Sequence, residues 1–170
     1  MNRTQSTKKG ILKSIVVFCL MIAMLAGTVG TVSTVSAAPK GYGFTYKRTT
    51  VYMHGKAKSI LQKAGKPKSK SESKSCAYDG MDRTYTYKDF VVKTYSKSKK
   101  GTEYVNSIVL KTSKVSTKEG LKIGNSKNDM IDIYGRAKSN FGVYTYKKGK
   151  CKLMIEVEDD KVTGITYVAV

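Results

Sequence analysis

Hydrophobic and polar residues alternate most clearly near the end of the chain, over residues 151–157. A period of two residues is typical of a strand with one buried face. The pairs Lys148-Gly149 and Asp159-Asp160, one on each side, favour tight turns. The buried face would carry Cys151, Leu153, Ile155 and Val157, and the other face Lys152, Met154 and Glu156.

A helical spacing occurs twice. Within residues 55–67, hydrophobic residues recur at positions i, i+3, i+4 and i+7, which places them on one face of a helix. Gly65 and Pro67 then end the pattern. In the second segment, Ser126 is suited to cap a helix that Gly135 ends. The first helical face consists of Ala57, Ile60, Leu61 and Ala64.

Three strand-like segments follow each helical segment. The first set spans residues 85–88, 90–95 and 104–110, and the second spans 144–147, 151–157 and 161–167. A shift of 70 residues superposes Ile60 on Met130 and Gly65 on Gly135. The Lys/Ser-rich stretch 66–75 between a helix and its strands is interpreted as a mobile loop.

These patterns predict an α+β fold of two tandem units, each a short helical element followed by an antiparallel three-stranded meander. One such unit buries too little surface alone, whereas two can share a core. The expected organisation is a signal peptide at 1–37, a lead segment at 38–52, repeat unit 1 at 53–111 and repeat unit 2 at 112–170.

The N-terminal segment has the layout of a secretory signal peptide: basic residues, then a hydrophobic run, then small residues ending at Ala37. The hydrophobic run of about 12 residues is shorter than the roughly 20 needed to span a bilayer. We therefore expect cleavage after Ala37 and no stable membrane span after processing. An uncleaved anchor is the alternative. The expected location is secreted or extracellular, with cell-wall association as a further option.

Positive charge dominates the chain. Four of its 32 basic residues and none of its 12 acidic residues precede Ala38, so the rest carries a net charge of +16. Such a charge attracts polyanions over a long range. For an exported protein these are anionic wall polymers, acidic glycans and lipid surfaces, and no nucleic-acid partner is expected. Plain solubility is the alternative explanation.

Two cysteines remain after cleavage, Cys76 and Cys151. Export permits a disulfide, which would close a loop of about 75 residues worth roughly 4 kcal/mol in the chain-entropy model. Nothing in the sequence shows whether the two thiols meet. The disulfide is therefore one of two alternatives, the other being a pair of free thiols.

Several of these segments resemble a group of small exported proteins of Gram-positive bacteria, many of them lipoproteins. The resemblance is carried by the helix ending in Gly65, by the segments 75–80 and 85–87, and by the stretch 117–124. Their helix-then-meander unit is similar to that of β-lactamase inhibitor protein and of the small outer-membrane-assembly lipoprotein family. The resemblance implies a fold that binds other proteins and carries no catalytic residues. This chain lacks the lipid-attachment cysteine, which argues against a membrane tether.

Residues that could support catalysis or metal binding are few. His54 is the only histidine, and a loop position explains it better than a nucleophilic pair with Cys76. One histidine and two distant cysteines do not form the close ligand pairs of a zinc site. The acidic run that ends in Asp159-Asp160 is better explained as a turn than as a calcium loop. We therefore predict no catalytic residues, no metal site and no cofactor.

What remains is surface recognition. Tyrosine offers a large flat ring with a polar tip, which suits protein recognition, and the chain has 12 tyrosines. We expect a non-enzymatic module that binds a protein partner, as yet unknown, through a concave sheet surface. The alternative is a basic protein retained at the wall by anionic polymers. The candidate partner-binding residues are Tyr85, Tyr87, Tyr144 and Tyr146, and the alternative for each is a place in the core.

Overall fold

The computed structural model describes residues 41–76 and 79–170. The chain divides into two compact units, Met1–Ala37 and Ala38–Val170. The buried hydrophobic core of the described residues lies in the second unit. The predicted signal peptide lies outside the described residues.

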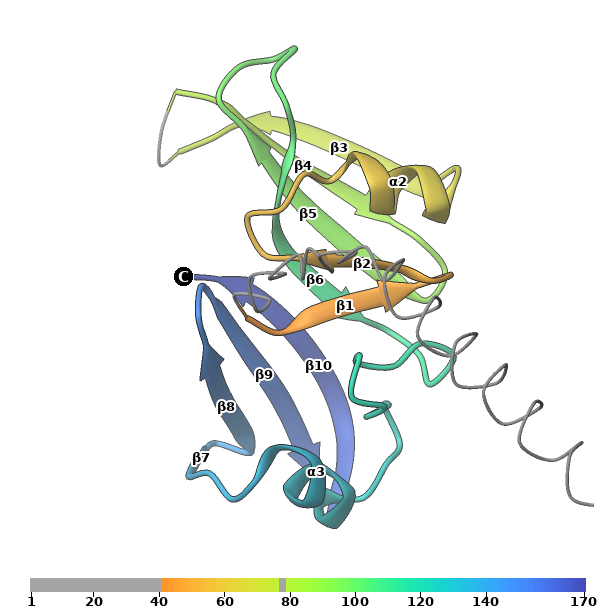
Figure 1. Ribbon diagram of the computed structural model, residues 1–170, viewed down its shortest axis with the longest axis vertical. Coiled ribbons are helices and arrows are strands. Elements are labelled where there is room, and N and C mark those ends of the chain that lie inside the picture. Colours follow the sequence, from red (N-terminus) through yellow and green to blue (C-terminus); the bar gives the residue numbers. More distant parts are fainter. Residues whose placement is uncertain (1–40, 77–78) are drawn as a thin grey trace, which may run out of the picture. The chain divides into compact units, whose positions relative to one another are not determined.

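Eight strands form one antiparallel sheet in the order β3-β4-β5-β6-β10-β9-β8-β7 (Figure 1). Among the described residues there are two further strands, which pair as a hairpin, and two short helices. The elements are β1 (Gly43–Tyr46), β2 (Thr49–Tyr52), α2 (Lys58–Ala64), β3 (Ser69–Lys74), β4 (Met81–Thr86), β5 (Phe90–Ser96), β6 (Tyr104–Leu110), α3 (Lys127–Tyr134), β7 (Ser139–Asn140), β8 (Val143–Lys148), β9 (Cys151–Glu158) and β10 (Lys161–Ala169).

The prediction of an α+β fold made of two helix-plus-meander units is wrong. The described residues are mostly β, and β6 pairs with β10, so both predicted meanders belong to one continuous sheet. The sheet is also wider than predicted, because β3 and β7 extend it at its two edges. Local patterns located six of its strands, but the pairing of β6 with β10 joins segments more than 50 residues apart along the chain.

Both helices were predicted correctly. In α3 the Ser126 hydroxyl accepts the Asp129 backbone N–H, and the Asp129 carboxylate accepts the Ser126 backbone N–H, which completes a capping box. Gly65 and Gly135 end the two helices with positive φ angles of 78° and 83°. The inward side chains Ile60 and Met130 are fully buried.

The stretch 66–75, interpreted as a mobile loop, is an edge strand instead. Residues Ser69 to Lys74 pair along their whole length with β4, and every one of their side chains is exposed. Because only one edge is bonded and neither face is buried, the strand needs no hydrophobic alternation. Lysine on an edge strand also discourages pairing with a further chain.

The predicted lead segment contributes a hairpin to the core. Phe44 of β1 is fully buried, and Val51 of β2 is 4% exposed. The Phe44 ring lies 5.1 Å from Phe90 of β5 and 6.2 Å from Tyr167 of β10, measured between centroids. The hairpin therefore packs across the junction where the two strand sets meet.

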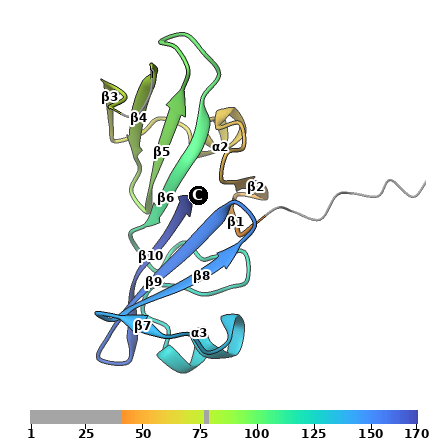
Figure 2. The ribbon, with the colours of Figure 1, turned by 90° about the vertical axis from the view of Figure 1, so that its left-hand side faces the viewer.

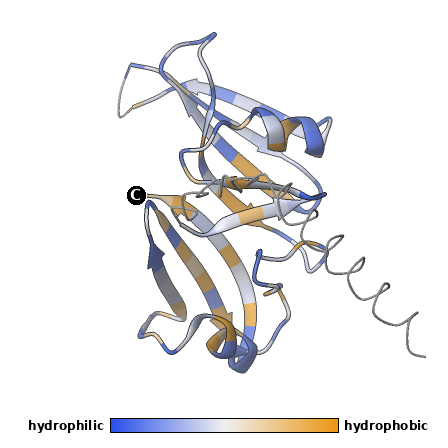
Figure 3. Ribbon diagram, in the orientation of Figure 1, coloured by the Kyte–Doolittle hydropathy of each residue, from blue (hydrophilic) through white to orange (hydrophobic). Residues whose placement is uncertain are grey.

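One face of the sheet holds the core. Figures 1 and 2 show α2, α3 and the β1–β2 hairpin on the same side of it. Hydrophobic and hydrophilic residues alternate along β9 and β10 in Figure 3, as expected for strands with one covered face. The central row of the covered face runs through Tyr85, Val92, Ile108, Tyr167, Leu153 and Tyr146.

Candidate functional site

The opposite face of the sheet is a candidate binding surface. Within residues 41–76 and 79–170, no helix or hairpin packs on it (Figure 2). Two rows of outward side chains cross it from β3 to β8, and we call these rows the open face. One row is Ser69, Thr86, Val91, Val109, Thr166, Met154 and Thr145, and the other is Ser71, Thr84, Lys93, Ser107, Val168, Lys152 and Lys147.

Short and β-branched side chains fill the centre of the open face, and lysines flank them. Val91, Val109 and Thr166 are half-buried, because neighbouring strands cover their sides but nothing described covers their tips. Lys147 and Lys152 lie directly opposite each other on β8 and β9, an arrangement that costs stability. No carboxylate of the described residues forms an ion pair with either of them. The surface is thus partly hydrophobic and positively charged on one flank.

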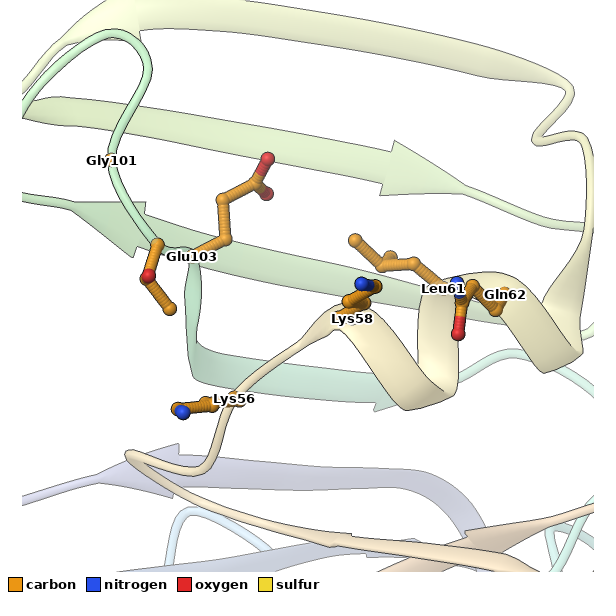
Figure 4. A pocket seen from close by; sticks show the side chains of 7 residues that line it. Lys56, Lys58, Leu61, Gln62, Gly101 and Glu103 are labelled. Carbon is orange, nitrogen blue, oxygen red and sulfur yellow. The ribbon is translucent and has the colours of Figure 1, made fainter.

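A hollow of about 440 Å³ lies between α2 and the segment before β6 (Figure 4). Lys56, Lys58 and Gln62 line it together with Glu103. The Glu103 carboxylate is already engaged by the protein, accepting the Tyr85 hydroxyl at 2.9 Å and 3.0 Å and the Thr94 hydroxyl at 2.7 Å. This carboxylate therefore holds β4 and β5 to β6 and has little capacity left for a ligand.

Arg83 stands beside this carboxylate on the covered face of β4. Its side chain is only 4% exposed, its Nε donates to Glu72 at 2.7 Å, and its Nη1 donates to Ser96 at 2.7 Å. Its Nη2 donates to the Lys99 carbonyl. The Arg83 guanidinium holds the pKa of Glu72 below its ordinary value, mainly through the hydrogen bond that its Nε donates to the Glu72 carboxylate. Sequence reasoning missed Arg83, although the period of two that it shares with Tyr85 and Tyr87 indicates an inward position.

The four candidate partner-binding tyrosines lie on the covered face. Tyr85, Tyr87, Tyr144 and Tyr146 are between 6% and 9% exposed. Burial raises the pKa of Tyr85 far above its ordinary value, and the Glu103 carboxylate adds to this effect. Tyr146 donates its hydroxyl to the Gly135 carbonyl at 2.8 Å. The structure thus places these rings in the core, which was the alternative, and their burial disfavours a partner contact.

The two cysteines are not brought together. Cys76 is exposed in the segment after β3, Cys151 is fully buried at the start of β9, and both carry free thiols. Burial raises the pKa of the Cys151 thiol. Of the two alternatives, the structure has the pair of free thiols.

His54 lies at the edge of β6, where its backbone N–H donates to the Val105 carbonyl at 2.8 Å. Its ring nitrogens lie 3.4 Å from the Tyr95 hydroxyl and 3.3 Å from the Val170 carbonyl oxygen. Within residues 41–76 and 79–170, these contacts of the ring do not include Cys76. The structure therefore gives His54 a role in joining three segments.

The acidic run near residue 160 forms a turn, as expected. Asp159 and Asp160 have φ angles of 48° and 56° and occupy the two positions between β9 and β10. Among residues 41–76 and 79–170, no three histidine, cysteine or acidic side chains are grouped to hold a metal ion. None of the helices in that part of the chain has the length and hydrophobicity needed to cross a membrane.

Phe141 is the most exposed hydrophobic residue that sequence reasoning passed over. Its side chain is 99% exposed, and its φ angle is 48° in the turn between β7 and β8. A bulky residue in this left-handed region is strained, and such strain often marks functional positions. The adjoining Gly142, with φ of 77°, completes a two-residue hairpin turn.

No family model matches the chain, and no curated protein or solved structure was found to match it. The resemblance to β-lactamase inhibitor protein and to the outer-membrane-assembly lipoproteins therefore stays a prediction.

Proposed function

We propose that the chain is an exported, non-enzymatic binding module that recognises a protein partner through the open face of its sheet. The observation that carries this proposal is that an eight-stranded sheet has one face covered by α2, α3 and the hairpin, while nothing described covers the other. A surface of Val, Thr and Met side chains flanked by lysines has the mixed character of a protein interface.

Charge complementarity favours a protein partner with an acidic surface. Lys93, Lys147 and Lys152 flank the centre of the open face and have no ion-pair partner in the described part of the chain. Complementary charges speed association and select among partners more than they add affinity.

Both edges of the sheet are poorly suited to binding a further strand, so a partner should bind a face of the sheet instead. At one edge β3 carries Lys70 and Lys74, and at the other β7 has only two residues. Short or lysine-bearing edge strands resist the addition of a further strand. Phe141 adds an exposed aromatic ring beyond the short edge, and such rings are frequent anchors in interfaces.

A double variant tests the proposal. Immobilised unit Ala38–Val170 is used to recover proteins from culture supernatant and wall fractions, and each recovered protein is purified and titrated for saturable binding. Met154→Glu with Thr166→Glu places two carboxylates at the centre of the open face and should weaken binding of an acidic partner at least tenfold. Gln62→Glu with Ser139→Glu changes the net charge equally at exposed sites elsewhere and should leave affinity unchanged. Equal losses in both variants, or no saturable partner, would contradict the proposal.

A second candidate function is retention at the cell wall by anionic polymers. The net charge of +16 after residue 37 and the exposure of most lysines favour it. Attraction of this kind is screened by salt. Moderate salt should therefore release the protein from cells, and equal retention in low and high salt would exclude this function.

A further inference from the structure

The loops at one end of the sheet enclose a hollow of about 370 Å³. One wall is the turn region between β3 and β4, with Lys74 and Asp79, and the other is the loop between β5 and β6, with Lys97, Ser98 and Lys99. This hollow is separate from the open face and from the Glu103 hollow beside α2.

Positive charge outweighs negative charge in this hollow. Three ammonium groups and one carboxylate line it, and all four side chains are exposed. None of the three lysines forms an ion pair with a residue in the described ranges. The lining therefore carries an excess positive charge that its own residues do not neutralise.

The walls are fixed by hydrogen bonds from buried groups. The Ser96 hydroxyl, fully buried, donates to the Ser98 carbonyl at 2.8 Å, and Arg83 donates to the Lys99 carbonyl from beneath the loop. Across the hollow, the Ser75 backbone N–H donates to the Gly80 carbonyl at 3.0 Å. Because the carbonyls of Ser98 and Lys99 are already held, the β5–β6 loop should need little ordering on binding.

We infer that this hollow binds a phosphate group carried by an anionic polymer. Lysine binds phosphate as a compact point charge with three hydrogen-bond donors. The Ser98 hydroxyl adds a hydrogen-bond donor beside them. The inference gives the second candidate function a defined site and rests on that function.

A pair of variants with equal charge tests the site. Sodium polyphosphate is titrated into unit Ala38–Val170 at two salt concentrations, and its affinity is compared for Lys97→Ser with Lys99→Ser and for Lys138→Ser with Lys150→Ser. All four lysines are exposed, so both variants should fold and melt as the parent does. The first variant should bind roughly tenfold more weakly, and the second within about twofold of the parent.

Further measurements distinguish failure of the phosphate site from failure of polymer retention. Backbone amides of residues 97–101 should show the largest NMR shifts on titration. Equal losses in both variants would overturn the site while leaving polymer retention in place. Equal affinity for polyglutamate of matched charge would overturn phosphate recognition. If polyphosphate shows no salt-sensitive binding to the parent, both the site and polymer retention fail.

Discussion

Ile108 of β6 lies directly opposite Tyr167 of β10, and both side chains are fully buried. This pair sits at the junction of the two strand sets, with Val92 on one side and Leu153 on the other. The two sets therefore share a single core and should not unfold separately.

Ile108→Ala tests this shared core. Removing a fully buried aliphatic side chain should lower the free energy of unfolding by about 3 kcal/mol. Urea denaturation followed by fluorescence and circular dichroism should give one transition with the same midpoint for both probes. Ile60→Ala and Met130→Ala, one in each helix, should shift that same transition. Two separable transitions would show that the halves fold independently.

The Tyr167 hydroxyl is buried, and no hydrogen bond of ordinary geometry reaches it from the described residues, although the Lys118 backbone lies near it. Burial of this hydroxyl raises the pKa of Tyr167. A buried polar group without a partner is costly, so Tyr167→Phe should raise the free energy of unfolding by about 1 kcal/mol. Chemical denaturation measures the change, and Tyr85→Phe, which removes a hydroxyl bonded to Glu103, serves as the control and should destabilise. A loss of stability in Tyr167→Phe would mean that the hydroxyl has a partner after all.

The capping box of α3 should make the stability of the folded protein depend on pH in the acidic range. Hydrogen bonds from Ser126 lower the pKa of Asp129 below its ordinary value of 3.8. The ionised Asp129 carboxylate therefore stabilises the folded protein at pH values above 3.8, and this stabilisation is lost as the pH falls through the lowered pKa. Thermal melts between pH 7 and pH 2 should show a smaller acid-side loss in Asp129→Asn than in the parent.

Ser126→Ala removes the other half of the box and should cost about 1 kcal/mol at neutral pH. The helix α2, whose first residue is preceded by Ala57 with no side-chain cap, provides a comparison within the same chain. An unchanged stability in Ser126→Ala would show that tertiary packing alone holds α3.

Phe141→Asn should stabilise the turn between β7 and β8. Asparagine tolerates the positive φ of 48° better than phenylalanine, and Asn-Gly is the preferred pair for a two-residue hairpin turn. We expect a gain of up to about 1 kcal/mol in unfolding experiments, with no core packing lost because the ring is 99% exposed. If the change destabilises the protein, the Phe141 ring contributes contacts that the described residues do not show.

The two thiols should differ sharply in reactivity. In unit Ala38–Val170, a thiol reagent should modify the exposed Cys76 at once and the buried Cys151 only after denaturation. The thiolate is the reactive form, and burial keeps Cys151 in the thiol form. Counting reactive groups with and without denaturant measures the difference. No reactive thiol in either condition would indicate a disulfide instead.

Patterns of two and of 3.6 residues located both helices and six strands, because each of those elements buries one face. A strand without a buried face carries no such pattern. Ser69 to Lys74 pairs as an edge strand although every one of its residues is exposed. The pairing of β6 with β10 depends on contacts between distant segments, which no local period records.

The sequence predicted the polar side of one strand in the open face, but not the full set of residues on that face. Alternation along 151–157 placed Lys152 and Met154 on the polar side of their strand, where the structure has them. The tyrosines were harder, since a ring with a polar tip suits both a core and an interface. Tyr85 and Tyr146 satisfy their hydroxyls within the protein, at Glu103 and at the Gly135 carbonyl, and this satisfaction allows their burial.

The place of β10 in the sheet has a consequence for how the chain matures. This strand follows all the others along the sequence, yet it lies between β6 and β9 near the middle of the sheet. Until it emerges from the ribosome, Ile108 and Leu153 lack Tyr167, the β10 residue that lies between them. The core of the described residues can therefore close only after β10 has been synthesised, so β6 and β9 remain without their shared neighbour until then.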